Sequence, residues 1–402
     1  MSQSNVVFAA GRNPTREHLF ARAEDISADL SRRAADLDRE GRPPLAEIVK
    51  LKNAGLLNAL HPTQIGGGGL DWVDGLKLVR ILARGESSIG QLLGYHYVNS
   101  QYIYWALDAA RAHALASDTV ARNLYWGAAV NPRDRGLVLT RRRNGYVLNG
   151  RKSFSTAARV SDYINANATL DDKIAGFAVP TNRQGYFAND DWDNIGQRLS
   201  DSGSVEFHDF PVYEEDFVGV PAAPDAAPPV LSTFNTPFIQ LVFVNFYLGT
   251  AEGALHAAVD YVRNTTRPWI TSGVERAADD PYILERVGEF TAALKASAAL
   301  ADNAAAAVQA GLARGRDVTE RERGAAAAEA YAAKVHATHV SLDITSRVFE
   351  LTGARSTADK YRFDRFWRNV RTHTLHDPVF YKAREVGEFV LNDKIPEVSL
   401  YS

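Results

Sequence analysis

The sequence predicts an α+β protein in which a helical domain, an antiparallel β-domain and a helical bundle follow one another. The hydrophobic periodicity is helical before about residue 125, alternates as in strands to about residue 215, and is helical again beyond about residue 233. We therefore expect domains at 14–125, 126–220 and 233–395. The 402 residues, 46% of them hydrophobic, are enough for several lobes around shared cores.

The first region is expected to be helical because its aliphatic residues recur every three or four positions, notably within 45–57 and 76–82. Four consecutive glycines at 66–69 predict a flexible turn between helices. They do not form a phosphate-binding loop, because no strand precedes them and no Lys-Ser/Thr pair follows.

The middle region carries the signals of β-strands. Asn144-Gly145 is a dipeptide typical of a hairpin turn and lies between two short apolar runs. Because no helical pattern separates the apolar runs, we expect an antiparallel domain rather than a strand–helix–strand fold. The expected strands are 137–140, 146–148, 174–179 and 205–210.

The last region begins after a Pro/Ala-rich segment, 221–229, which is typical of a linker. Two Ala-rich segments, Ala292 to Ala310 and Ala325 to Ala337, are strong helix formers. Their small side chains permit close helix–helix approach, so we expect a helical bundle.

One long apolar stretch, Thr236 to Ala257, raises the question of a membrane span. Gln240, Asn245 and Glu252 interrupt it, so it predicts a buried helix and no membrane partner. Residues 1–13 lack the basic and apolar regions of a signal peptide, and we expect a cytoplasmic protein.

Composition and missing motifs exclude several functions. A net charge of −3 argues against nucleic-acid binding, and the absence of cysteine excludes a thiol nucleophile, a disulfide scaffold and a Cys-ligated metal. No Gly-x-Gly-x-x-Gly follows a strand and no Walker motif occurs, which argues against a tightly held nicotinamide dinucleotide or nucleoside triphosphate. The nucleophile motif of α/β-hydrolases is also missing.

Two histidine pairs have a spacing that places both side chains on one helical face, His336 with His339 and His373 with His376. With Asp377, the second pair could form a two-histidine, one-carboxylate iron site. We favour an ordinary bundle helix for the first pair and a structural or cofactor-facing pair without metal for the second.

The segment 361–378 interleaves arginine with aromatic residues. Arginine forks bind phosphate and planar groups stack on flat heterocycles, so this segment can line an anionic, aromatic ligand. The alternative is that its arginines pair with internal carboxylates such as Asp364. At its end Asp377 precedes Pro378, and we expect Asp377 to cap a last helix at 379–390.

The helical–β–helical layout resembles the acyl-CoA dehydrogenase fold over nearly the full chain. Several segments are similar to its flavin-dependent monooxygenase branch, typified by dibenzothiophene monooxygenase and the sulfur-acquisition oxidoreductases: 94–96, 190–192, 195–196, 201–204, 267–269 and 363–382. The resemblance implies a homotetramer, O₂ as co-substrate, and reduced flavin from a separate NAD(P)H:flavin reductase. FMN is expected, with FAD as the alternative.

The resemblance also implies the chemistry. Most acyl-CoA dehydrogenases have a glutamate base near the C-terminus, and the corresponding segment here, 375–378, offers the imidazole of His376 instead. We therefore expect one oxygen to pass from a flavin C4a-hydroperoxide to an organosulfur compound, a sulfide, a sulfoxide or a thiophene-type sulfur, as in desulfurization. The alternatives are an FAD-dependent acyl-CoA dehydrogenase, an N- or aromatic hydroxylase using the same hydroperoxide, and a scaffold protein without catalysis.

The resemblance assigns the site residues by position. His376, Thr156, Tyr95 and Gln91 are the expected catalytic residues, no metal ligand is expected, and a lid loop is expected near 134–138. The dibenzothiophene monooxygenases of this branch have a histidine, an asparagine and a serine where Gln91, Ala128 and Thr156 stand here, which weakens the case for dibenzothiophene as substrate. The expected cofactor-binding residues are Tyr95, Trp126, Gly127, Ala128, Ala129, Val130, Asn131, Lys152, Ser155, Thr156, Trp192, Arg267, Ala354, Arg355 and His376.

Overall fold

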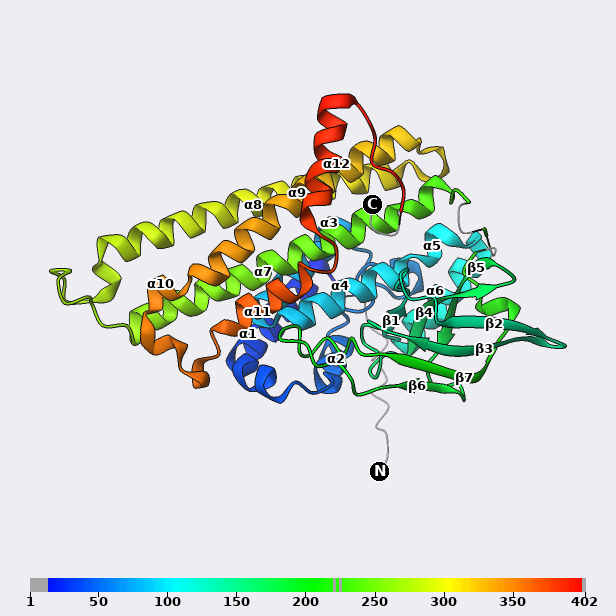
Figure 1. Cartoon of the computed structure of the whole chain (residues 1–402), viewed down its shortest axis with the longest axis horizontal. Coiled ribbons are helices and arrows are strands. Elements are labelled where there is room, and N and C mark those ends of the chain that lie inside the picture. The colour runs from blue at the N-terminus through cyan, green and yellow to red at the C-terminus, as the bar shows by residue number, and fades with distance from the viewer. Residues whose placement is uncertain (1–13, 220–221, 224–225, 400–402) are drawn as a thin grey trace.

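The structure is a computed structural model that describes residues 14–219, 222–223 and 226–399. Helices form both ends of the described chain, and a sheet lies at one end of the long helical body (Figure 1). This arrangement confirms the predicted α+β class and the order of its parts. Residues 1–13 and part of the expected linker 221–229 lie outside the described residues.

The first lobe is helical, as predicted. α4 follows α3 after the single residue Glu86, and every residue of α4 except Tyr95 is buried. α4 is therefore a core helix in which only Tyr95 is partly exposed. The helices are α1 (Arg16–Glu40), α2 (Leu45–Asn53), α3 (Trp72–Gly85), α4 (Ser87–Gln101), α5 (Ile103–Ala106) and α6 (Ala109–Arg122).

The four-glycine turn is tightly packed rather than flexible. A Cβ added to Gly67 would lie 2.1 Å from the carbonyl oxygen of His61, and one added to Gly68 would lie 2.8 Å from that of Ala59. Glycine is needed here because neighbouring backbone leaves no space for a side chain.

The middle lobe is one seven-stranded sheet in the order β1-β4-β2-β3-β7-β6, with β5 paired to β4. The predicted hairpin forms between β2 and β3, although Arg142 pairs with Gly145, so the turn residues are Arg143 and Asn144. Four strand pairs are antiparallel, but β4 runs parallel to both β1 and β2, which the antiparallel prediction omitted. The strands are β1 (Trp126–Ala129), β2 (Leu137–Arg142), β3 (Gly145–Lys152), β4 (Tyr163–Leu170), β5 (Lys173–Pro180), β6 (Tyr186–Ala188) and β7 (Val205–Val212).

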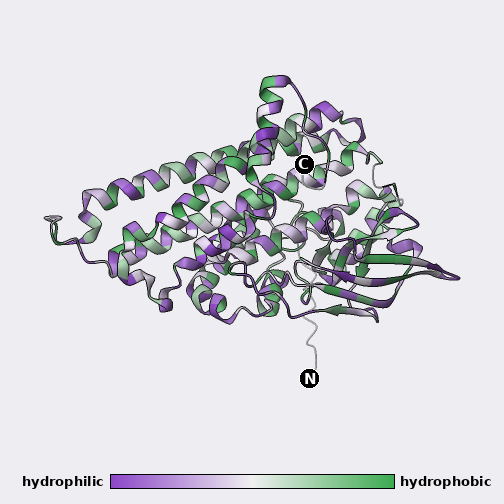
Figure 2. Cartoon of the chain, in the orientation of Figure 1, coloured by the Kyte–Doolittle hydropathy of each residue, from purple (hydrophilic) through white to green (hydrophobic). Residues whose placement is uncertain are grey.

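The last lobe is a bundle built around α7, which packs against α3, α4, α8 and α9. Hydrophobic and hydrophilic turns alternate along the bundle helices (Figure 2). The helix Val230–Asn264 is long and apolar enough to cross a membrane, but 89% of its most apolar window is buried inside the protein, so the prediction of a buried core helix is confirmed. The helices are α7 (Asn235–Asn264), α8 (Pro281–Ala313), α9 (Glu320–Arg347), α10 (Phe349–Thr352), α11 (Asp364–His373) and α12 (Val379–Asn392).

The expected cap of the last helix is wrong. α12 begins where predicted, but Pro378 precedes it and no side chain caps it. Asp377 is buried instead and pairs with the ammonium of Lys334 on α9. A cap contributes about 1 kcal/mol, whereas a buried charge without its partner costs several times as much, so the ion pair decides where Asp377 lies.

Candidate active site

Three segments meet at one face of α4. Ser87, Gln91 and Tyr95 follow one another at four-residue intervals on this helix and so share a face. The side-chain amide of Gln197, from the loop after β6, donates to Ser87 Oγ at 2.8 Å, and its backbone N–H donates to Asn369 Oδ1 of α11 at 2.7 Å. The loop that carries Trp192 is thereby fixed to both helices.

His373, at the end of α11, lies at the centre of this junction. Its Nε2 is 3.1 Å from the hydroxyl of Tyr95 on α4, and its Nδ1 is 2.7 Å from the hydroxyl of Tyr247 on α7. Burial holds the pKa of His373 well below its ordinary value, and the neighbouring Lys334 ammonium acts in the same direction. His373 is therefore a neutral imidazole that joins the buried phenol of Tyr247 to the partly exposed phenol of Tyr95.

His376 stacks on His373 from the outer side. The two rings are parallel within 2° and their centroids are 5.3 Å apart. The side chain of His376 is 42% exposed, whereas His373 is buried, and the ring of Phe243 on α7 lies against both. His376 is thus the imidazole that a ligand can reach, on a rigid and largely aromatic support.

A buried ion pair lies behind His376. Asp377 Oδ1 is 3.2 Å from His376 Nδ1 and 3.4 Å from Lys334 Nζ. Gln240 of α7 completes the network, since its amide donates to Asp377 Oδ2 at 3.2 Å and its carbonyl accepts from Lys334 at 3.1 Å. Burial opposes ionisation, but Lys334 and His376 keep the pKa of Asp377 well below its ordinary value, and burial lowers the pKa of Lys334 to about 8.

Thr156 lies in a turn that a second set of contacts holds in place. Phe154 and Ala157, on either side of it, have positive φ angles of 54° and 64°, an uncommon backbone conformation for residues other than glycine. Backbone hydrogen bonds tie 155–158 to 200–203, and Thr156 Oγ1 lies 3.1 Å from Ser202 Oγ. The strained turn therefore presents a fixed, buried hydroxyl.

The remaining predicted residues near Thr156 come from β1 and from the Trp192 loop. A Cβ on Gly127 would lie 2.1 Å from Ser161 Oγ, and the N–H of Ala128 donates to the carbonyl of Thr156 at 3.4 Å, so β1 runs close against the turn. Trp192 donates from Nε1 to the carbonyl of Gln197 at 2.8 Å and meets the exposed ring of Phe154 edge-on.

Two predicted cofactor contacts point their side chains elsewhere. The indole of Trp126 is fully buried, stacks on Tyr163 and donates to Thr119 Oγ1 at 3.2 Å. The ammonium of Lys152 bonds the backbone and side-chain oxygens of Asn167 inside the β-domain, where burial lowers its pKa to about 8. Both side chains serve the protein core.

The other predicted residues from 129 to 155 differ in exposure. Ala129 is buried in the β-domain core and Ser155 Oγ donates to the carbonyl of Lys152 at 3.4 Å, whereas Val130 is exposed. Asn131, before the expected lid loop, donates to Ser153 Oγ at 3.5 Å. Asp134, the first residue of that loop, accepts from the N–H and the hydroxyl of Ser153, both at 2.8 Å, so the start of the loop is anchored just after β3.

Arg267, Ala354 and Arg355 lie apart from the site within one chain. All three are exposed, beyond the C-terminal end of α7 and beside α10. At 1.5 Å per residue, the end of α7 is about 25 Å from Tyr247 along the helix, so these residues cannot reach a ligand at His376 of the same chain.

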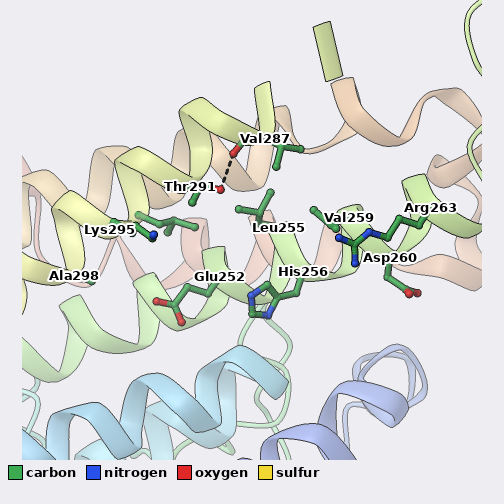
Figure 3. A pocket seen from close by; sticks show the side chains of 11 residues that line it. Glu252, Leu255, His256, Val259, Asp260, Arg263, Val287, Thr291, Lys295 and Ala298 are labelled. Atoms are coloured by element: carbon green, nitrogen blue, oxygen red, sulfur yellow. Dashed lines mark hydrogen bonds between the residues drawn. The ribbon is translucent and has the colours of Figure 1, made fainter. Parts of the chain in front are cut away.

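A pocket of about 530 Å³ also lies outside the site, between α7 and α8. Figure 3 shows Glu252 and His256 on one wall and Thr291 and Lys295 on the other, with charges of both signs. None of the predicted site residues lines it.

The arginines of 361–378 support the alternative that the sequence left open. Arg362 and Arg368 pair with the buried Asp38 at 2.7 and 2.6 Å, and Arg368 also pairs with Asp364 at 2.7 Å. They hold α11 against α1. Among the residues that the structure describes, no group of three or more His, Asp or Glu side chains is placed to hold a metal ion.

Sequence reasoning missed the residues that support His376. The sequence alone does not single out Phe243, Tyr247 or Lys334, and it predicts a helix cap at Asp377. The signals were present: Gln240 interrupts an apolar helix, and Lys334 interrupts an Ala-rich one. A polar group in a segment that is otherwise buried needs a hydrogen-bond partner. Here Lys334 donates to the side-chain carbonyl of Gln240.

Comparison with known proteins places this site in a family. The acyl-CoA dehydrogenase N-terminal, middle and C-terminal domain models match residues 15–117, 134–210 and 241–379. The chain therefore belongs to the acyl-CoA dehydrogenase family.

Its relatives place the chain among the flavin-dependent monooxygenases of this family. The chain is 37% identical to dibenzothiophene monooxygenase of Mycolicibacterium goodii, over 92% of this chain and 94% of that one. It is also 37% identical to SfnC of Pseudomonas putida, a probable FMNH2-dependent monooxygenase, over 95% and 97%. Among solved structures, methanesulfinate monooxygenase MsuC of Pseudomonas fluorescens matches with a TM-score of 0.90 and 35% identity, over 95% and 99% of the two chains. TdsC of Paenibacillus sp. A11-2 with FMN and indole gives 0.91 and 34%, over 96% and 100%.

Proposed function

We propose that the protein is the oxygenase of a two-component system. It takes reduced FMN from a separate NAD(P)H:flavin reductase and transfers one atom of O₂ to the sulfur of a small organosulfur compound. The observation that carries the proposal is the exposed imidazole of His376, in the segment that the resemblance aligns with the dehydrogenase base. The nearest carboxylate, Asp377, is buried and paired with Lys334, so it is a poor base for removing a substrate proton.

The residues present fit a flavin. Gln91 Oε1 is buried and has no hydrogen-bond partner among the described residues, so a ligand donor can satisfy it. Thr156 offers a fixed hydroxyl, and Trp192 offers a half-buried ring for a flat heterocycle. We assign the ring to a site lined by Gln91, Tyr95, Thr156, Trp192 and His376, with 127–131 and Ser155 along its edge. Trp126 and Lys152 enter this site only through their backbone.

Reduced flavin, when bound, would supply the electrons that activate O₂, one atom of which is transferred. The chain's own residues bind, orient and exclude water. Thr156 offers a hydrogen bond to the reacting oxygen atoms. His376 can accept one from them through Nε2, because Asp377 keeps the proton of the imidazole on Nδ1. The buried His373 and the partly exposed Tyr95 form an uncharged wall beside His376, which keeps water from that side.

We infer a homotetramer in the cytoplasm. Arg267 and Arg355 are exposed and far from His376 in their own chain, so they can hold the flavin phosphate only in a neighbouring subunit. Trp269 and Ile270, in the same loop as Arg267, are 73% and 90% exposed, as residues covered by another subunit would be in an isolated chain. Size-exclusion chromatography with light scattering tests the tetramer.

The function is tested by single-turnover oxygenation. The protein is mixed without air with photoreduced FMN, then with ¹⁸O₂ and a panel of sulfides, sulfoxides, sulfinates and thiophenes. We expect one ¹⁸O atom per product on sulfur, detected by mass spectrometry. Amines and indoles in the same panel test N- or aromatic hydroxylation, and butyryl-CoA tests desaturation. Oxidation of none of the sulfur compounds would contradict the proposal.

Thr156 provides a matched pair of variants. Thr156→Val keeps the shape and removes the hydroxyl, and we expect product formation to fall about 5- to 30-fold, which corresponds to about 1–2 kcal/mol of lost hydrogen bonding. Thr156→Ser keeps the hydroxyl and should stay within about threefold of the unsubstituted protein. Equal losses in the two variants would show that packing at this turn matters rather than the hydroxyl.

A further inference from the structure

Lys334 is a buried cation that the proposed reaction does not itself require. It lies in the Ala-rich helix α9, its side chain is 1% exposed, and its ammonium faces the rings of Phe243 and Tyr247 at 4.3 and 5.2 Å. Burying an ammonium and a carboxylate together costs desolvation energy that their attraction often only balances. The pair is therefore weak as a source of stability, and its position directly behind His376 suggests another role.

The geometry indicates what the pair does. A carboxylate can only accept hydrogen bonds, so the contact of Asp377 Oδ1 with His376 Nδ1 requires the proton of a neutral imidazole to be on Nδ1. Nε2 is then the acceptor nitrogen of the ring. If Asp377 lost its charge, either nitrogen could carry the proton and the ring could turn.

We propose that Lys334 is a positioning residue, which holds Asp377 as the carboxylate that fixes the tautomer and orientation of the His376 imidazole. Lys334, Asp377 and His376 thus form a chain of contacts between charged and polar groups, which runs from α9 to the exposed imidazole ring. The inference rests on the proposed function, because it gives His376 a task at the reacting oxygen. No proton needs to move along this chain of contacts. Its only effect is to fix the tautomer and the orientation of the His376 imidazole.

The other groups around Asp377 do not replace Lys334. Lys382 of α12 is buried but pairs with Glu385 at 3.0 Å. His373 of α11 is neutral, and burial raises the pKa values of the nearby phenols, so they are uncharged. These phenols are Tyr95 of α4, Tyr247 of α7 and Tyr331 of α9. Lys334 is therefore the cation that most lowers the pKa of Asp377.

The test uses Lys334→Met, Asp377→Asn and, as the matched control, Lys382→Met. The control removes an equally buried ammonium whose partner is a different carboxylate. Flavin-free protein with ¹⁵N-labelled histidine rings is examined by long-range ¹⁵N–¹H correlation spectra, with His376→Asn to assign the signal. We expect a single Nδ1–H tautomer for His376 in the unsubstituted protein and in the control, and a mixture in the other two variants.

The pH profile of oxygenation gives a second measurement. Without Lys334, burial raises the pKa of Asp377, so the carboxyl gains a proton as the pH falls, and the hydrogen bond to His376 is lost on the acid side. We expect the acid limb of Lys334→Met to move up by about one pH unit or more, and that of Lys382→Met to move less. Asp377→Asn should lose activity across the whole range instead.

The outcomes separate the two proposals. An Nδ1–H tautomer that stays single in Lys334→Met overturns the role of Lys334, whether or not the protein oxygenates sulfur. If that variant does not fold, an unchanged tautomer in Asp377→Asn overturns it equally. Equal mixtures in Lys334→Met and Lys382→Met would also overturn it, because any buried lysine would then act alike. Failure of the unsubstituted protein to oxygenate any sulfur compound counts against the proposed function alone.

Discussion

Replacing His376 with leucine is expected to lower product formation by about 10²- to 10³-fold, the usual contribution of one positioned acid–base group. Leucine fills the space beside Phe243 but offers no hydrogen bond to the reacting oxygen. O₂ should still be consumed in the presence of reduced FMN. Because the oxygen is no longer held for transfer, we expect it to leave as hydrogen peroxide instead of entering the product.

The measurement is the ratio of product to hydrogen peroxide per O₂ consumed, followed as the substrate concentration rises. His339→Leu is the matched control, because His339 is exposed on α9 and belongs to the other histidine pair. It should leave the ratio unchanged. Unaltered coupling in His376→Leu would show that the exposed imidazole does not act on oxygen, and the site assignment would then be wrong.

Much of the fold could be predicted because its signals are local. Apolar residues at helical spacing and the Ala-rich runs give the helices of both lobes, and alternation around Asn144 gives the hairpin. The parallel pairing of β4 with β1 and β2 has no local signal, since it joins strands far apart in the sequence. Alternation also does not show which face of a strand meets the core. The burial of Lys152 inside the β-domain could therefore not be predicted from the sequence.

The candidate site was predictable where one helix carries it. Gln91 and Tyr95 share a face of α4. The prediction for His373 and His376 holds less well, because α11 ends at His373 and the turn beyond it brings the ring of His376 onto that of His373. What lies opposite them depends on contacts over more than a hundred residues, such as Tyr95 and Tyr247 with His373. The prediction that Asp377 caps the last helix is wrong for the same reason, because the local sequence does not show that Lys334 lies beside Asp377.

Asp38→Ala is expected to cause the largest loss of stability. Asp38 is 1% exposed, near the end of α1, and its two oxygens accept from Arg362 and from both terminal nitrogens of Arg368. Removing the carboxylate leaves two guanidinium groups with one buried partner fewer, and such losses cost about 3–5 kcal/mol. Because these arginines are 18% and 14% exposed, we expect about 3 kcal/mol, measured as the free energy of unfolding in urea.

The matched control is Asp36→Ala in the same helix. Asp36 also pairs with an arginine, Arg39 at 2.6 Å, but both side chains are exposed, and such a pair contributes about 0–1 kcal/mol. Similar losses in the two variants would show that Asp38 contributes no more than a surface charge.

Arg368 also donates to the carbonyl of Ile195 and precedes Asn369, which holds Gln197. The loss of Asp38 should therefore loosen the Trp192 loop and weaken binding of reduced FMN at temperatures where the variant is still folded.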